Sequence, residues 1–325
     1  MGWFKDFARV VTSWVESFKP VLWGNRTKKF YVVGHRGACA YEVENTIPSL
    51  QKALYLGANA LEIDISFTKD KIPVLWHDFT PDDAVALARL LGLESDKFAY
   101  PDAPAIGNKY RKPVPELTLS QLRKHFGWKN KETGDHIPDA VIPTLEDVMQ
   151  WATNQHELEL VFFDMKVNDD YLHVIPTMMK EIVKLIEKYK PHYQIVFMTP
   201  RESAFREMKK LYPKLDYTLD IELPMGLLID EQDYASVPVA QRNKNRFASV
   251  GISVLGQVAP WETYKRIIKY DVSQKQDIML CGWTINDEKQ MKALVNLGVD
   301  GLVTDFPEKL ALIANHLIPT TASGF

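Results

Sequence analysis

The sequence has 325 residues, of which 39 are lysine or arginine and 42 are aspartate or glutamate, giving a formal net charge of −3. Because both signs are interspersed, the charge gives no reason to expect nucleic acid as a partner. The two cysteines are too few for a disulfide framework. The length suits one large barrel, since (β/α)8 barrels take about 250 residues as one unit, or two ordinary domains.

The chain opens with a short amphipathic segment, residues 1–28. Apolar residues recur at three- and four-residue steps from Trp3 to Phe18, with charged residues between them, which predicts a helix that ends at Pro20. The segment is too short and too charged for a transmembrane span, and it lacks the features of a signal peptide. We therefore expect a cytoplasmic protein in which residues 3–18 either pack on the protein body or a second subunit, or make peripheral membrane contact.

Beyond residue 29, apolar runs typical of buried strands alternate with helical patterns. This alternation indicates a closed parallel barrel or a doubly wound sheet. The predicted strands are 30–34, 60–65, 72–76, 158–163, 194–198, 217–221, 248–254, 278–283 and 301–304. The predicted helices include 46–56, 145–151, 171–189, 202–211 and 307–317. We expect one main domain at 29–317, followed by a tail at 318–325.

One stretch interrupts the alternation after the third predicted strand. Residues 80–114 contain four prolines around a short helical pattern at 83–91. Loops of this length are usually functional or disordered. We expect an insertion that covers the substrate mouth, and the alternative is a surface elaboration without substrate contact.

The second predicted strand carries two acidic residues on one face. Glu62 and Asp64 are two residues apart, so their side chains point the same way, while positions 61, 63 and 65 are apolar. Buried carboxylates must be paired or bound to a cation. Oxygen ligands of this kind suit Mg²⁺ or Ca²⁺ better than Zn²⁺. The strand therefore predicts a site for one hard divalent cation.

Two histidines and an arginine follow the first and third predicted strands. His35 and His77 suit proton transfer because imidazole titrates near neutrality. Arg36 offers a planar fork of donors that fits two phosphate oxygens. Strand ends on one rim of a barrel converge on one site. Together these clusters indicate metal-assisted hydrolysis of a phosphodiester, although each residue alone also fits a structural role.

The order of the motifs resembles the glycerophosphodiester phosphodiesterase family. HRG at 35–37, ENT at 44–46, E-x-D at 62–64 and HD at 77–78 precede GWTIN at 282–286 and GVDGLVTDFP at 298–307. The resemblance implies an α/β fold, a (β/α)8 TIM barrel, here with an insertion after the third strand and an extra N-terminal helix. It also implies cation-dependent hydrolysis of glycerophosphodiesters to an alcohol and glycerol 3-phosphate. Two histidines then act as acid and base, by position His35 and His77.

The resemblance assigns further site residues. The family's first two metal ligands match Glu62 and Asp64. The family's third ligand, usually the acid of an E-x-K strand, falls on Asp164, whose side chain is one methylene shorter than that of glutamate. The residues expected to bind substrate or phosphate are Arg36, Glu44, Lys166 and Trp283. The tryptophan would cover a glycerol face or a quaternary ammonium group, with a core position as the alternative.

The substrate remains open at this stage. One alternative is a small, water-soluble glycerophosphodiester. Another is a lysophospholipid hydrolysed at a membrane, as by lysophospholipase D-like or sphingomyelinase D-like enzymes, which the D-x-K pattern at 164–166 and the aromatic N-terminal segment favour. A non-catalytic lipid-binding barrel fits less well with the full set of acids, histidines and arginine. The sequence also leaves oligomer formation open.

Overall fold

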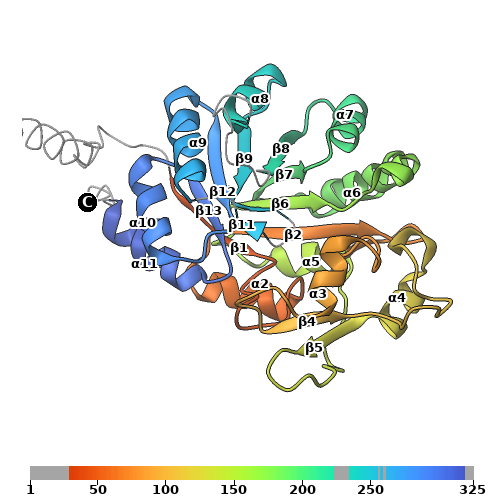
Figure 1. Cartoon of the computed structure of the whole chain (residues 1–325). Coiled ribbons are helices and arrows are strands. Elements are labelled where there is room, and N and C mark those ends of the chain that lie inside the picture. Colours follow the sequence, from red (N-terminus) through yellow and green to blue (C-terminus); the bar gives the residue numbers. More distant parts are fainter. Residues whose placement is uncertain (1–28, 223–233, 255–256, 259–260, 319–325) are drawn as a thin grey trace, which may run out of the picture.

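The computed structural model describes residues 29–222, 234–254, 257–258 and 261–318. Its main body is a closed ring of eight parallel strands surrounded by helices (Figure 1), and β1 pairs with β2 to close the ring. The ring strands are β1 (Tyr31–His35), β2 (Ala60–Phe67), β6 (Leu160–Met165), β7 (Gln194–Thr199), β8 (Asp216–Glu222), β9 (Phe247–Gly251), β12 (Met279–Trp283) and β13 (Gly301–Thr304). The predicted (β/α)8 barrel is confirmed.

Helices cover the outside of the ring, and local sequence signals explain where some begin. Thr46 caps its helix by accepting a hydrogen bond from Ser49 N, and Thr144 forms a capping box with Asp147. Each cap contributes roughly 1 kcal/mol. The outer helices are α2 (Ile47–Tyr55), α5 (Leu145–Ala152), α6 (Ile175–Tyr189, after a 3-10 turn at Asp169–Val174), α7 (Glu202–Leu211), α8 (Ser236–Arg242), α9 (Trp261–Gln274), α10 (Glu288–Leu297) and α11 (Pro307–Leu317).

Apolar side chains fill two spaces, one on each side of the strand ring. Residues such as Ile63 and Leu145 pack between strands and helices, and residues such as Phe162 and Val196 fill the ring lumen. Full burial of a side chain of this size contributes about 1.5–3 kcal/mol. Polar groups on the lumen side of a strand are costly unless they are paired. Buried acids at such positions therefore indicate a functional site.

The predicted strand at 72–76 is not a barrel strand. β3 (Pro73–Leu75) pairs antiparallel with the end of β2, with Leu75 opposite Ile65. The link between β2 and β3, residues 68–72, is too short for the crossover that parallel strands require. The expectation of a third parallel strand ending at His77 is therefore wrong, and the segment after β3 follows the second barrel strand. β3 instead returns the chain to the level of Asp64, whose carbonyl accepts from Trp76 N at 3.2 Å.

Between β3 and α5 the chain forms an insertion, residues 77–143, at one side of the ring (Figure 1). A separate apolar core holds it together, in which the rings of Trp76 and Trp128 lie 5.1 Å apart. The insertion therefore extends beyond the proline-rich residues 80–114. Its elements are α3 (Ala84–Leu90), β4 (Ala99–Asp102), a 3-10 turn (Val114–Glu116), α4 (Leu119–His125) and β5 (Gly127–Asn130), with β4 and β5 antiparallel.

Three sequence expectations concern the ends of the chain and the cysteines. The predicted helix at 3–18 and the tail beyond residue 318 lie outside the described residues. Among the helices that are described, none has the length and apolar character needed to cross a bilayer. Cys39 and Cys281 are buried free thiols.

Candidate active site

Three acidic side chains meet where β2 and β6 run side by side. Asp64 and Asp164 are direct partners in the parallel register, and Glu62 lies two residues earlier on the same face of β2. Each carboxylate offers an oxygen, and these atoms lie within 4.8 Å of one another. All three side chains are buried. The structure thus brings the three predicted metal ligands together.

The donor set fits a hard divalent cation. Burial, and then the charges of Asp64 and Asp164, raise the pKa of Glu62 well above its usual value. Asp164 Oδ1 is buried and makes no hydrogen bond to any described residue. Unpaired buried oxygen is costly, and carboxylate oxygens are the ligands that Mg²⁺ and Ca²⁺ prefer. The cluster therefore offers carboxylate oxygens, one of them unpaired among the described residues, to such an ion, whose charge would offset the repulsion at Glu62.

Asp64 is fixed from three sides. Lys166 Nζ lies 3.0 Å from Asp64 Oδ1 and also contacts Asp164. Arg36 Nε lies 3.1 Å from Asp64 Oδ2, and Asn45 Nδ2 donates to the same oxygen at 2.6 Å. Burial acts to raise the pKa of Asp64, but Lys166 and Arg36 outweigh it and hold the pKa below its usual value. The carboxylate is therefore ionised and held in place.

His35, at the end of β1, is oriented by a carboxylate from the neighbouring strand. Asp305 follows β13 and lies 2.6 Å from His35 Nδ1, so this nitrogen carries the proton, and Nε2 lies 3.9 Å from Glu62. Lys97 of the insertion donates to the same Asp305 oxygen at 2.7 Å. Burial, and then the charges of Lys97 and Arg36, lower the pKa of His35 to about 4. The ring is therefore neutral near pH 7.

His77 has a similar arrangement on the insertion side. Asp78 Oδ1 lies 2.7 Å from His77 Nδ1, and Arg89 Nε donates to the same oxygen at 2.8 Å. Burial, and then the charges of Arg36 and Lys166, lower the pKa of His77 well below its usual value. Each histidine therefore has Nδ1 next to a carboxylate, which favours the tautomer with the proton on Nδ1.

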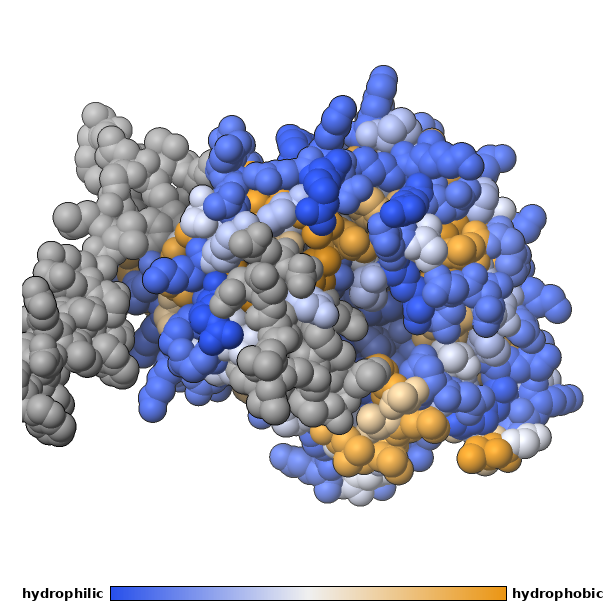
Figure 2. Space-filling model, turned by 45° about the horizontal axis from the view of Figure 1, so that its top comes forward, coloured by the Kyte–Doolittle hydropathy of each residue, from blue (hydrophilic) through white to orange (hydrophobic). Residues whose placement is uncertain are grey.

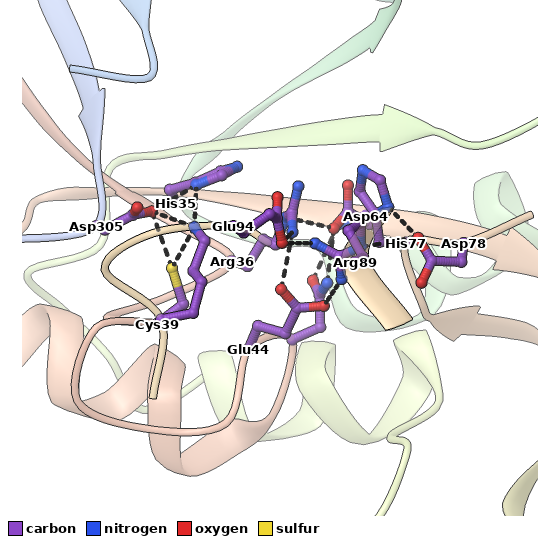
Figure 3. A network of polar contacts seen from close by, with 12 residues as sticks. His35, Arg36, Cys39, Glu44, Asp64, His77, Asp78, Arg89, Glu94 and Asp305 are labelled. Carbon is purple, nitrogen blue, oxygen red and sulfur yellow. Dashed lines mark hydrogen bonds and ion pairs between the residues drawn. The ribbon is translucent and has the colours of Figure 1, made fainter. Parts of the chain in front are cut away.

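Buried guanidinium groups connect the barrel rim with the insertion (Figure 3). Arg36 Nη1 donates to Glu44 at 2.8 Å and lies 3.7 Å from Glu94. Arg89 contacts Glu44, Glu94 and Asp78, and it is 1% exposed. The loop after β1 and helix α3 thus share one ion-pair network.

Trp283 lies apart from this network, at the end of β12. Its indole packs over Gly251, where an added Cβ would come within 2.5 Å of the ring, and against apolar residues of the lumen. Trp283 is partly buried and is the last residue of β12. Its role in binding stays a prediction.

Sequence reasoning missed four charged residues of the site, namely Arg89, Glu94, Lys97 and Asp305. Asp305 directly follows the last predicted strand, which could have placed it beside His35 once the barrel was assumed to close. The other three lie in the proline-rich stretch, where charges without periodicity resemble a solvated loop. Only tertiary contacts reveal that Arg89 and Lys97 are buried, with side chains 1% and 6% exposed.

Comparison with known proteins agrees with this geometry. Residues 35–309 match the model of the glycerophosphoryl diester phosphodiesterase family. The chain is 24% identical over 297 residues to a glycerophosphodiester phosphodiesterase of Caldanaerobacter subterraneus subsp. tengcongensis, with 87% of this chain and 96% of that protein covered. It is 22% identical over 323 residues to a lysophospholipase D of Homo sapiens, with 93% and 92% covered.

Solved structures share the fold at low sequence identity. A glycerophosphodiester phosphodiesterase of Parabacteroides distasonis gives a TM-score of 0.60 at 18% identity, over 90% of this chain and 99% of that one. A phosphodiesterase of Oleispira antarctica, solved with the product sn-glycerol-3-phosphate, gives 0.58 at 18% identity, over 87% and 96%. The family match spans most of the chain, so the protein belongs to the glycerophosphoryl diester phosphodiesterase family and is a phosphoric diester hydrolase.

Proposed function

We propose that this enzyme hydrolyses small glycerophosphodiesters to an alcohol and glycerol 3-phosphate, with the help of one divalent cation, Mg²⁺ or Ca²⁺. The proposal rests on one arrangement, a cluster of three buried carboxylates that two carboxylate-oriented histidines accompany. The Oleispira antarctica relative was solved with sn-glycerol-3-phosphate, the product expected of this reaction.

The carboxylates of Glu62, Asp64 and Asp164 would hold the cation. When bound, such an ion polarises a non-bridging phosphate oxygen and neutralises charge that develops during the reaction. Arg36 and Lys166 already contact the carboxylate cluster, and in the proposed role they hold the remaining phosphate oxygens. The residues proposed to support the substrate around them are Glu44, which accepts from Arg36, and Trp283.

The two histidines are the proposed proton carriers. One removes a proton from the attacking hydroxyl, which belongs to water or to the substrate, and the other gives a proton to the leaving alkoxide. Asp305 and Asp78 support this role because each holds Nδ1 of one ring and thereby favours a single tautomer. The ring that removes a proton must be neutral before the reaction, and the ring that gives a proton must be protonated, a form that the negative charge of a bound phosphodiester would favour.

Hydrolysis of glycerophosphocholine tests the proposal directly. We expect activity to disappear with a chelator and to return with added Mg²⁺ or Ca²⁺. His35→Ala and His77→Ala should each lower kcat by about 10²- to 10⁴-fold, the usual contribution of a general acid or base. Circular dichroism would verify that both variants remain folded. Substantial turnover in either folded variant contradicts the assignment.

Lysophosphatidylcholine is the second substrate to assay, because removing its choline breaks the same kind of bond and a human relative is named lysophospholipase D. The ratio of kcat/KM for glycerophosphocholine and lysophosphatidylcholine, measured with each cation, distinguishes the two substrate classes. We expect the ratio to favour glycerophosphocholine. A ratio well below one would assign the enzyme to lysophospholipids.

A further inference from the structure

A second group of potential metal ligands includes the catalytic His35. His35 Nδ1, Cys39 Sγ and an oxygen of Asp305 lie within 4.8 Å of one another. Cys39 Sγ donates to Asp305 Oδ1 at 2.9 Å, and His35 Nδ1 lies 2.6 Å from the same oxygen. Figure 3 shows these three side chains, which we call the mixed-ligand group, pointing toward one another. The proposed function uses the imidazole and the carboxylate but not the thiol.

The ammonium group of Lys97 stands where a metal ion would contact the mixed-ligand group. Its Nζ lies 2.7 Å from Asp305 Oδ1 and 3.2 Å from both Cys39 Sγ and His35 Nδ1. Phe98 N donates to Cys39 O at 2.9 Å, which ties the backbone next to Lys97 to the loop that carries the thiol. The side chains of Lys97 and Asp305 are 6% and 3% exposed. A buried positive charge thus already occupies the position between the three ligands.

The two ligand groups of the site suit different ions. Glu62, Asp64 and Asp164 offer only oxygen, which Mg²⁺ and Ca²⁺ prefer. The mixed-ligand group combines imidazole nitrogen, thiol sulfur and carboxylate oxygen, which are the atoms that bind Zn²⁺ in proteins. Three protein ligands leave one position of a tetrahedral ion for water. The mixed-ligand group therefore favours Zn²⁺ over the ions proposed for catalysis.

Exchange of Lys97 for a divalent ion leaves the net charge of the group unchanged. Without a metal, the Lys97 ammonium balances the Asp305 carboxylate, and the Cys39 thiol keeps its proton, which it donates to Asp305. When Zn²⁺ enters, the thiol releases one proton, and thiolate and carboxylate together balance the two charges of the ion. Lys97 can turn its ammonium toward water on its flexible four-carbon stem. The exchange therefore avoids the cost of an unpaired buried charge.

The exchange also requires a small movement of the ligand atoms. Atoms about 2.0–2.3 Å from a tetrahedral ion lie about 3.3–3.6 Å from one another. His35 Nδ1 and Cys39 Sγ now lie 2.6 and 2.9 Å from Asp305 Oδ1. Each pair must therefore separate by less than about 1 Å, into space that the ammonium of Lys97 leaves.

We propose that His35, Cys39 and Asp305 bind one Zn²⁺ ion in exchange for Lys97, and that this ion inhibits the enzyme. With the metal on Nδ1, a neutral imidazole carries its proton on Nε2. The ring can then neither accept a proton at Nε2 nor hold the extra proton that an acid must give. Metal binding rests on the geometry of the group, whereas inhibition also rests on the proposed function of His35.

Cobalt absorption tests the site without relying on activity. Co²⁺ bound to a thiolate absorbs strongly in the near ultraviolet by charge transfer, whereas Co²⁺ bound only to oxygen does not. This difference matters because the chain has 42 aspartates and glutamates, and Figure 2 shows hydrophilic residues over most of the face that it displays. The intact chain is titrated with Co²⁺ in excess Mg²⁺, which fills the carboxylate cluster. We expect a thiolate band that saturates at one Co²⁺ per chain and disappears when Zn²⁺ displaces Co²⁺.

The two native cysteines provide a matched pair of variants. Cys39→Ser should abolish the band, and circular dichroism would verify that this variant is folded. Cys281→Ser should keep the band, because Cys281 is also a buried free thiol but belongs to the apolar cluster of the lumen. Lys97→Met removes the competing cation and should raise the affinity for Co²⁺ by about tenfold or more. A gain of affinity cannot result from misfolding, so this variant tests the exchange independently.

Inhibition is measured as the Zn²⁺ concentration that halves hydrolysis of glycerophosphocholine in excess Mg²⁺. We expect Cys39→Ser to require about tenfold more Zn²⁺ than the wild type, or a larger excess, because it lacks one of three ligands. Lys97→Met should require about tenfold less, or a smaller concentration still. Each rate is compared with that of the same variant without Zn²⁺.

Four results would overturn the metal site. They are absence of the thiolate band in the wild type, its survival in folded Cys39→Ser, its loss in folded Cys281→Ser, and unchanged Co²⁺ affinity in Lys97→Met. Equal inhibition of the wild type and Cys39→Ser would overturn the inhibitory role, since the inhibiting ion would then bind elsewhere. If the wild type does not hydrolyse glycerophosphocholine at all, the proposed function fails while the cobalt band still decides the metal site.

Discussion

The barrel rim and the insertion supply different groups to one site. The rim contributes the carboxylates of Glu62, Asp64 and Asp164, whose positions follow from hydrogen-bonded register between neighbouring strands. The insertion contributes two buried cations, Arg89 and Lys97, whose positions depend on ion pairs with the rim. Register is local to the sheet and is robust, whereas the ion pairs exist only when both regions are docked. Damage to the insertion should therefore move the three acids little. Loss of the ion pairs, in contrast, should loosen the attachment of the insertion to the barrel.

Neutralising one rim acid without changing its shape should have the largest effect. In the wild type, Arg36 N donates a hydrogen bond to Glu62 Oε2 at 3.0 Å. Glu62→Gln keeps an oxygen that can accept this bond but removes one negative charge from the cluster. We expect kcat/KM to fall by about 10³-fold or more. With a chelator present, the free energy of unfolding should stay equal or rise, because Asp64 and Asp164 disfavour a negative charge on Glu62. Steady-state kinetics measure kcat/KM, urea unfolding measures the free energy, and calorimetric titration measures the Mg²⁺ affinity. Tight Mg²⁺ binding with full activity would contradict the assignment.

The next effect concerns how firmly the insertion is attached. Arg89→Met leaves the carboxylates of Asp78, Glu44 and Glu94 without their shared buried cation, and removing one partner of a buried ion pair costs about 3–5 kcal/mol. Urea unfolding should show a loss of this size. Arg246→Met is the control, because Arg246 pairs with Asp216 at the surface, where such pairs contribute about 0–1 kcal/mol. Similar losses in both variants would mean that the network does not hold the regions together.

A buried carboxylate on the outer helix α9 separates the effect of pH on the fold from its effect on the site. Asp271 accepts hydrogen bonds from Ser236 and Val237, yet burial raises the pKa of Asp271 to about 6. Since the folded state then binds the proton more tightly than the unfolded state, this group's contribution to stability is lost as the pH rises from about 4 to about 6. Relative to Asp271→Asn, the wild type should lose about 2–3 kcal/mol across that window. Equal pH profiles in urea unfolding would contradict the shift.

The smallest expected effect concerns Lys97, a residue of the insertion that helps to position His35. Lys97 donates to Asp305, the carboxylate that accepts from His35 Nδ1, and so helps to hold the ring through Asp305 without reaching the carboxylate cluster. Lys97→Met should lower kcat on glycerophosphocholine about tenfold and change KM little, as is usual for groups that orient a catalytic residue. Lys97→Arg should recover part of the loss. An unchanged kcat in Lys97→Met would mean that Lys97 does not help to orient His35.

Local pattern was sufficient for the parts of the site that depend on local geometry. The two-residue spacing of Glu62 and Asp64 fixes their shared face whatever the rest of the chain does. The capping signals at Thr46 and Thr144 likewise act over three residues. Asp164 could be proposed only through the family resemblance, because its alignment with Asp64 depends on pairing between strands that are far apart in sequence.

One error could have been avoided from the sequence, and one omission could not. The direction of β3 could have been inferred, since residues 68–72 are too few for a parallel crossover. The burial of Lys97 could not, because nothing near it in the sequence distinguishes it from a solvated lysine. Its partner Asp305 is 208 residues away.

The antiparallel return of β3 has a consequence for how the protein can change. β2 pairs with β6 as far as Ile65, and its last two residues, Ser66 and Phe67, pair only with β3. This short ribbon is where the chain leaves the barrel and returns with His77. A descendant gene could therefore exchange everything carried by the ribbon for a segment of another size while the cation ligands keep their register. The two histidines therefore lie on different pieces of chain, His35 at the end of a barrel strand and His77 at the start of the insertion.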